Sequence, residues 1–261
     1  MKIITFFAIL ISVYSCKSQN DTTALQTKKK EKTLIENNEI IEFQSKHQLK
    51  QESKSIGTVS NGKLENGCYL PFEGENYKYF AENSYLMGRC FINCAINSFL
   101  ISTFKDLESS IPNRTFYLME ASNEKGGKIS PHRTHQNGTS IDLMVPLMKE
   151  NTPYTKLDTI GIEHYLLNFN EKGEYIEDTA IKIDFETLAL EILTIEKNAR
   201  LHNWKISKVI LKTEYQKFIF STKYSDQLKS SNIYFTQKLE PAINQLHDDH
   251  IHIDFEEVVR N

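Results

Sequence analysis

The sequence predicts an α+β fold, with an antiparallel sheet that carries the residues of a metal site and helices packed on one side. Residues 139–147, TSIDLMVPL, are apolar or β-branched and end soon after a proline, which is typical of a buried strand. Residues 250–258, HIHIDFEEV, alternate polar and apolar residues, which predicts a second strand. Residues 185–203, FETLALEILTIEKNARLHN, have the apolar periodicity of an amphipathic helix.

Size and composition indicate an ordinary globular protein. The chain has 261 residues, enough for one large domain or two small ones. Its net charge of −3 gives no indication of a nucleic-acid partner. Nothing in the sequence indicates an oligomeric state.

The first residues predict export. Residues 1–15, MKIITFFAILISVYS, contain one Lys and then an apolar run that is too short for a permanent membrane span, as in a secretory signal. Cys16 follows and resembles the lipid-modified cysteine of bacterial lipoproteins; an ordinary signal peptide is the alternative. Residues 16–54 are polar and predict a flexible tether. Part of this tether could form a short exposed helix. The folded domain is expected over 55–261.

Histidines cluster in two windows. Five of the eight lie in SPHRTHQNGTSIDLMVP (130–146) and HDDHIHIDF (247–255). Asp142 falls inside the first predicted strand, where a carboxylate needs a charged or hydrogen-bonding partner. A period of two places His250 and His252 on one face of the second strand. A site with His135, Asp142 and His252 as ligands would leave a fourth position open for water, as in catalytic Zn²⁺ sites.

The spacings resemble a known family. The motif H-x-x-H-x-x-G-x-x-x-D at 132–142, followed by H-x-x-H-x-H at 247–252, resembles the penicillin-insensitive murein endopeptidases. These zinc peptidases belong with the lysostaphin-type enzymes, the D-Ala-D-Ala dipeptidases and the Hedgehog fold. The resemblance extends from about Ser55 to Phe255. It implies that His135, Asp142 and His252 bind zinc and that His250 is the catalytic base.

The resemblance gives the two other histidines of these motifs a place in the site. His132 and His247 would be site histidines, with His247 as a donor to the developing oxyanion. Ser140 stands where the family often has a second Asp, and Gln245 and Leu246 replace an aromatic pair.

The resemblance implies zinc-assisted hydrolysis of the D-alanyl-diaminopimelyl cross-link of peptidoglycan, outside the cytoplasm. The protein would be periplasmic and held at the membrane through Cys16. One alternative is a D,D-carboxypeptidase or another wall amidase with the same zinc site. Another is a metal-binding wall protein without turnover.

Three cysteines follow Cys16. Export permits a disulfide, and Cys68 is expected to pair with Cys90 or Cys94. Cys90 and Cys94 are expected on one helix, where a spacing of four disfavours a bond between them.

The remaining segments give less specific expectations. Residues 114–122 and 206–215 predict strands, and residues 216–229 predict a helix. His202 is expected at the end of the helix over 185–203. Gly126 and Gly127 are expected to allow close approach or positive φ in the loop before the site. Residues 147–182 are expected to be an irregular insertion that shapes one wall of the cleft, where Tyr154, Tyr165 and Tyr175 could touch substrate.

Overall fold

The computed structural model describes residues 38–47 and 52–258. The chain divides into two units, Met1–Lys46 and His47–Asn261, and each is described by itself. In the first unit residues 38–46 are helical. The predicted export signal and Cys16 lie outside the described residues. Within the described ranges, no helix combines the length and the apolar character that crossing a membrane would need.

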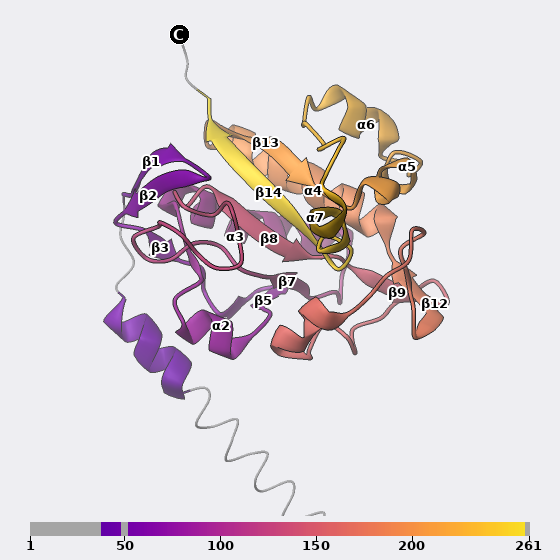
Figure 1. The fold of residues 1–261 in the computed structure, drawn as a ribbon, viewed down its shortest axis with the longest axis horizontal. Coiled ribbons are helices and arrows are strands. Elements are labelled where there is room, and N and C mark those ends of the chain that lie inside the picture. Colours follow the sequence, from indigo (N-terminus) through magenta and orange to yellow (C-terminus); the bar gives the residue numbers. More distant parts are fainter. Residues whose placement is uncertain (1–37, 48–51, 259–261) are drawn as a thin grey trace, which may run out of the picture. The chain divides into compact units, whose positions relative to one another are not determined.

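A six-stranded sheet organises the second unit (Figure 1). Its strand order is β13-β14-β8-β7-β5-β4, and neighbours are antiparallel except for the parallel pair β5 and β7. The bounds are β4 (Glu73–Gly74), β5 (Tyr77–Tyr79), β7 (Phe116–Leu118), β8 (Ser140–Met144), β13 (Trp204–Ile210) and β14 (His250–Glu257). Together with the helices described below, this sheet confirms the predicted α+β class.

The two strands of the histidine windows are direct neighbours. In the antiparallel register of β8 and β14, His252 lies opposite Asp142 and Asp254 lies opposite Ser140. Residues opposite each other in such a pair point to the same face of the sheet. A pairing between segments more than a hundred residues apart therefore brings the two halves of the predicted site together.

The other face of the sheet packs against helices. Helices α3 (Cys94–Ser110) and α4 (Phe185–Leu201) lie behind it in Figure 1. The ring of Phe99 on α3 packs edge-on against Phe255 on β14, with centroids 5.2 Å apart. Ile251 and Ile253 share the Phe255 face and are fully buried. Period-two alternation thus directs the apolar residues of β14 to the helices and its histidines to the opposite face.

Capping residues explain where both helices begin. The Asn93 side chain accepts a hydrogen bond from the Ala95 backbone N–H, and the Asp184 side chain accepts one from the Thr187 N–H. α4 ends at Leu201, and His202 is its C-cap residue, at the end of the helix as predicted. α3 does not begin early enough to include Cys90, so the prediction that Cys90 and Cys94 share one helix was wrong.

The disulfide confirms the prediction that Cys68 pairs with Cys90 or Cys94, and it shows which of the two is the partner. Cys68 forms a disulfide with Cys94, 26 residues later. Cys90 is a buried free thiol. Burial raises the pKa of the Cys90 thiol well above its ordinary value, so this thiol stays protonated and unreactive.

Residues 147–183 are more regular than predicted. They form a second, four-stranded sheet in the order β10-β9-β12-β11. Its strands are β9 (Leu147–Lys149), β10 (Thr152–Pro153), β11 (Glu174–Tyr175) and β12 (Asp178–Ile183). Between β10 and β11 lies the 3-10 helix η1 (Gly161–Leu166).

The remaining elements are short. The strand predicted over 114–122 is only three residues long, as β7, and the helix predicted over 216–229 is two separate helices, α5 and α6. The others pair or pack locally: β1 (Lys54–Thr58), β2 (Asn61–Glu65), β3 (Cys68–Tyr69), β6 (Phe91–Ile92), α2 (Glu82–Leu86), η2 (Thr213–Tyr215), α5 (Gln216–Ile219), α6 (Ser225–Ser230) and α7 (Pro241–Gln245).

Candidate metal centre

A loop between β7 and β8 carries His132 and His135. Gly126 and Gly127 adopt the positive φ expected of them, 69° and 78°. A Cβ on Gly126 would lie 2.3 Å from the Gln136 carbonyl oxygen, so only glycine allows this close approach. His135 itself has φ 66°, a region that few non-glycine residues adopt. The loop backbone is thus shaped to present the fully buried His135 ring to the sheet.

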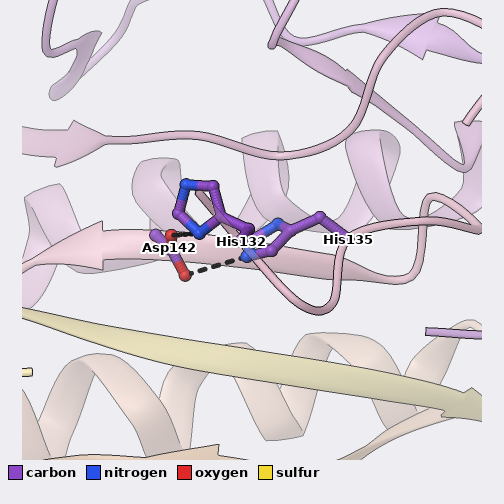
Figure 2. A group of neighbouring side chains, drawn as sticks. All are labelled: His132, His135 and Asp142. Atoms are coloured by element: carbon purple, nitrogen blue, oxygen red, sulfur yellow. Dashed lines mark ion pairs between the residues drawn. The ribbon is translucent and has the colours of Figure 1, made fainter. Parts of the chain in front are cut away.

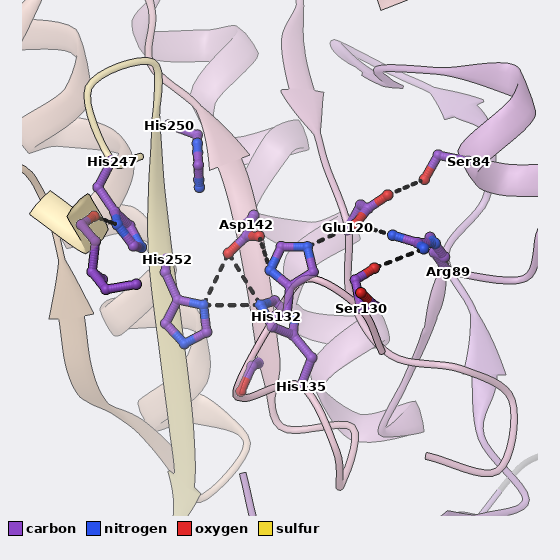
Figure 3. A network of polar contacts seen from close by, with 12 residues as sticks. Ser84, Arg89, Glu120, Ser130, His132, His135, Asp142, His247, His250 and His252 are labelled. Carbon is purple, nitrogen blue, oxygen red and sulfur yellow. Dashed lines mark hydrogen bonds and ion pairs between the residues drawn. The ribbon is translucent and has the colours of Figure 1, made fainter. Parts of the chain in front are cut away.

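Three side chains converge above β8 and β14. His135 Nε2 lies 3.3 Å from Asp142 Oδ1, and His252 Nδ1 lies 2.9 Å from the same oxygen. His252 Nδ1 is 3.0 Å from His135 Nε2. Figure 2 shows the approach of His132 and His135 to Asp142, and Figure 3 adds His252. The structure therefore brings together the three residues predicted as ligands.

His132 belongs to the same group. Its ligand atom and those of His135 and Asp142 all lie within 4.8 Å of one another. His132 Nδ1 is 3.6 Å from Asp142 Oδ2. The described residues of the site thus offer a fourth candidate ligand beside the three predicted ones.

The spacing of these atoms suits a metal ion. Bonds of about 2.0–2.1 Å in tetrahedral geometry put the ligand atoms of zinc about 3.3 Å apart. The three observed separations, 2.9–3.3 Å, are close to that value. Asp142 Oδ2 and His135 Nδ1 are also buried without a hydrogen-bond partner among the described residues. The three ligand atoms lie close together, and unsatisfied polar atoms lie beside them. Such an arrangement can bind a cation.

Electrostatics favour a positive charge at this point. Burial alone would favour neutral Asp142, but the imidazoles of His135 and His252 hold the pKa of its carboxyl well below the ordinary range. Burial also lowers the pKa of His252, yet the carboxylates of Asp254 and Asp142 outweigh it and raise that pKa to about 9. A metal ion would compete with a proton for the same nitrogen.

Asp254 orients His252. His252 Nε2 donates to Asp254 Oδ1 at 2.7 Å, which directs Nδ1, the nitrogen that a metal ion would bind in place of a proton, at Asp142 and His135. Ser140 Oγ donates to the same Asp254 oxygen at 2.6 Å, and Lys208 Nζ lies 2.6 Å from the other oxygen. A carboxylate behind a ligand histidine fixes its tautomer and orientation in many metal sites.

Glu120 does the same for His132 and was not predicted. Its Oε2 lies 2.7 Å from His132 Nε2 and 2.9 Å from Arg89 Nη1, while Ser84 Oγ donates to Oε1 at 2.8 Å (Figure 3). Glu120 is 2% exposed and lies in the apolar stretch RTFYLMEAS. A buried carboxylate in an apolar segment was the signal that singled out Asp142, and it could have found Glu120. The sequence holds no such signal for Arg89.

His250 forms a dyad with Asp249. The two are hydrogen-bonded through His250 Nδ1 and Asp249 Oδ1 at 2.5 Å. The ionised carboxylate can only accept, so Nδ1 carries the proton and Nε2 keeps a lone pair. Burial lowers the pKa of His250, but the Asp249 carboxylate outweighs it and the net shift is upward. His250 is therefore a more basic imidazole than an isolated buried one.

His247 has the opposite character. Its ring lies 5.1 Å from the His250 ring, and its Nδ1 donates to the Ile243 carbonyl at 2.7 Å. Burial, with the neighbouring His250, lowers the pKa of His247 to about 4. A neutral ring whose proton is on Nδ1 has only a lone pair on Nε2. In this state His247 accepts hydrogen bonds at Nε2, which does not suit the donor role expected from the sequence.

Comparison with known proteins agrees with this geometry. The family model of the penicillin-insensitive murein endopeptidases matches residues 55–257. No curated protein matches the chain. The match spans both histidine motifs, the strands that carry them and the disulfide. The chain belongs to the family of penicillin-insensitive murein endopeptidases and is a peptidase that acts on the bacterial cell wall.

Proposed function

We propose that this murein endopeptidase is zinc-dependent and cleaves the D-alanyl-diaminopimelyl cross-link of peptidoglycan. The observation that carries the proposal is the convergence of His135 Nε2, Asp142 Oδ1 and His252 Nδ1 within 3.3 Å of one another. Imidazole with carboxylate is a ligand set that suits zinc. In the bound state zinc would supply a Lewis acid that polarises the scissile carbonyl and makes water acidic enough to react near neutral pH.

His250 is proposed as the general base. The Asp249 carboxylate holds its Nδ1 proton and so keeps the Nε2 lone pair in place to accept a proton from the attacking water. The same nitrogen then passes this proton to the amine that leaves from the cross-link. Asp249 orients the ring and stabilises its charged form, as a carboxylate does for the histidine of a catalytic triad.

His132 and His247 are proposed as site histidines with different tasks. Glu120 fixes the Nε2 side of His132 and keeps its Nδ1 toward Asp142, so His132 borders the metal site and could join it. His247 Nε2 can accept a hydrogen bond from a substrate amide or from the reacting water, because its own proton is held by the Ile243 carbonyl.

This chemistry involves no nucleophile of the protein. The free thiol of Cys90 is buried and protonated, and the described contacts of Ser140 and Ser84 are to carboxylates and to Tyr79. Because water attacks directly, no acyl-enzyme forms. β-Lactams inactivate wall enzymes by acylating a nucleophile, so the proposed mechanism predicts activity in the presence of penicillin.

The proposed location follows from residues outside the described structure. An export signal over 1–15 and a lipid on Cys16 would place the domain over 55–261 in the periplasm, on a tether of about forty residues. Two or more acyl chains are needed for firm anchoring, which a lipoprotein cysteine supplies.

The test combines product analysis with metal content. Purified protein is incubated with dimeric cross-linked muropeptides with and without penicillin, and the products are identified by mass spectrometry. We expect conversion to monomers in both cases, and loss on chelation with recovery on added zinc. Release of terminal D-Ala from intact dimers would instead identify a carboxypeptidase. Zinc binding with no product would identify a protein that binds metal without turnover.

Two variants separate binding from proton transfer. His252→Ala should lower both zinc content and activity, because it removes a ligand. His250→Ala should keep its zinc, measured by elemental analysis, and lose about 10²–10⁴-fold in rate, the usual contribution of a general base. If His250→Ala purifies without metal and His252→Ala retains it, the two roles are exchanged and the proposal in this form is wrong.

A further inference from the structure

The 3-10 helix η1 holds a tyrosine against the proposed base. Its Gly161–Leu166 backbone is tied to the start of β14, because His164 Nε2 lies 3.2 Å from the Asp249 carbonyl oxygen. The Phe169 N–H donates to the Asp248 carboxylate at 3.1 Å and fixes the chain just beyond η1. A segment anchored to both residues before His250 positions its side chains firmly with respect to the site.

Tyr165 occupies that position. Its ring meets the His250 ring edge-on, with centroids 5.4 Å apart and planes at 88°. Phe80 also packs edge-on against the tyrosine, at 5.4 Å and 80°. These two ring contacts hold the orientation of Tyr165 by packing, independently of its hydroxyl.

The Tyr165 hydroxyl is buried and has no hydrogen-bond partner among the described residues. A hydroxyl left in this state destabilises the folded protein, and unsatisfied groups of this kind are rare and often functional. Tyr79 offers a contrast within the same chain: its hydroxyl lies 3.3 Å from Ser84 Oγ and donates to the Arg89 carbonyl. The Tyr165 hydroxyl is thus a buried donor beside the proposed general base, and it can donate a hydrogen bond to an atom of a bound ligand.

The surroundings keep this hydroxyl protonated. Burial raises the pKa of Tyr165 well above its ordinary value, and the carboxylates of Asp142 and Glu120 raise it further. These are residues of the candidate metal centre and of its supporting network, so the phenol lies within the electrostatic reach of that centre. It acts as a donor over the whole physiological pH range.

We propose that Tyr165 is a catalytic residue that donates a hydrogen bond to the carbonyl oxygen of the scissile peptide bond as that oxygen becomes negatively charged. This inference rests on the proposed function. The tyrosine proton stays on its own oxygen; the proton of the water goes to His250 and then to the leaving amine. His247 cannot fill this role while its proton is held by Ile243, which leaves the oxyanion in need of another donor.

The decisive variant is Tyr165→Phe, which keeps both ring contacts and removes only the hydroxyl. Its kcat on the dimeric muropeptide should fall about 10²–10³-fold, as for loss of an oxyanion donor, because the bond strengthens in the transition state. KM should change little, since ground-state binding is retained. Zinc content should equal that of wild type, and the unfolding temperature should not fall, because the variant loses only a buried hydroxyl without a hydrogen-bond partner among the described residues. Tyr234→Phe is the control: its side chain is exposed, it lies outside the insertion and both histidine motifs, and the variant should retain full activity.

Other outcomes would overturn the inference. Wild-type kcat in Tyr165→Phe would show that the hydroxyl takes no part, and a loss of zinc in that variant would make the tyrosine a ligand instead. A rise in KM with unchanged kcat would make it a binding group only. If the phenylalanine variant does not fold, Tyr165→Met, which also lacks the hydroxyl, takes its place. Wild-type protein that binds no zinc or leaves cross-links intact would refute the proposed function itself, a separate result.

Discussion

Replacing Asp254 by Asn tests whether the carboxylate behind His252 sets the strength of metal binding. Asp254 Oδ1 accepts from His252 Nε2 at 2.7 Å and from Ser140 Oγ at 2.6 Å. Asn keeps the shape and one acceptor oxygen, so His252 can retain its orientation. What disappears is the negative charge, which Lys208 also faces at 2.6 Å. The substitution therefore changes the electron-donating strength of His252, the proposed ligand, more than its position.

The magnitude follows from burial. Asp254 is 3% exposed, so little solvent screens its charge from His252. Burial alone would raise the pKa of the Asp254 carboxyl, but the charge and hydrogen bond of His252 and the hydrogen bond of Lys208 hold it well below its ordinary range. Asp254 is therefore ionised at all working pH values. Loss of such a partner typically weakens metal affinity about 10–100-fold, or about 1.4–2.7 kcal/mol. We expect the upper half of that range.

The assay is a zinc titration against a chromogenic chelator, with unfolding temperature measured on the same samples. Asp178→Asn is the matched control, because Asp178 also lies 2.6 Å from a lysine, Lys149, but belongs to the small sheet and touches no residue of the site. Unchanged zinc affinity in folded Asp254→Asn, together with a loss in His252→Ala, would refute the reasoning: His252 would bind metal without help from its carboxylate.

Two further predictions concern stability and location. Burial raises the pKa of Glu191 from 4.5 to about 8, so between these values the folded state holds a proton that the unfolded state releases, and stability falls as pH rises. Glu191→Gln should remove up to about 1.4 kcal/mol per pH unit of this decline in urea unfolding between about pH 5 and pH 8; an unchanged slope would contradict it. Cys16→Ala should move the protein from the membrane fraction to the soluble one, and a wild type that is already soluble would exclude the anchor.

The parts of the fold that the sequence predicted are those with a local period. β8, β14 and α4 are long enough for alternation or helical spacing to be visible. β9 is not, at three residues, and its partner strand β12, six residues long, begins about thirty residues later in the chain. Pairing at that distance depends on packing, which a short window does not contain, so residues 147–182 were expected to be irregular.

The error at Cys90 has a different cause. The apolar residues before and after Asn93 have the spacing of one continuous helix. This periodicity gives no indication that the helix begins only after Asn93. That beginning is set by Asn93, whose side chain caps the first turn of α3, while Phe91 and Ile92 form β6. Asn is among the best residues at a helix start, so the signal was present but was outweighed by periodicity.

Histidine clustering was enough to find the candidate centre because ligand residues are chemically rare. Its supporting residues are ordinary ones, and only contacts identify them. Asp249 and Asp254 were visible as neighbours of the histidines, but their hydrogen bonds depend on side-chain direction. Arg89 reaches Glu120 from a different part of the chain, 31 residues away. Such roles arise from the tertiary fold and have no sequence pattern of their own.

Ser140 shows how one departure from the family pattern fits the rest of the site. The register of β8 and β14 puts it opposite Asp254, and its hydroxyl donates to that carboxylate at 2.6 Å. A second carboxylate at this position would face the first at the same short distance, and like charges so close cannot both remain ionised. One of them would take up a proton, and His252 would lose part of the charge that orients it. Serine instead supplies a donor, so in this chain Asp254 can support the histidine alone.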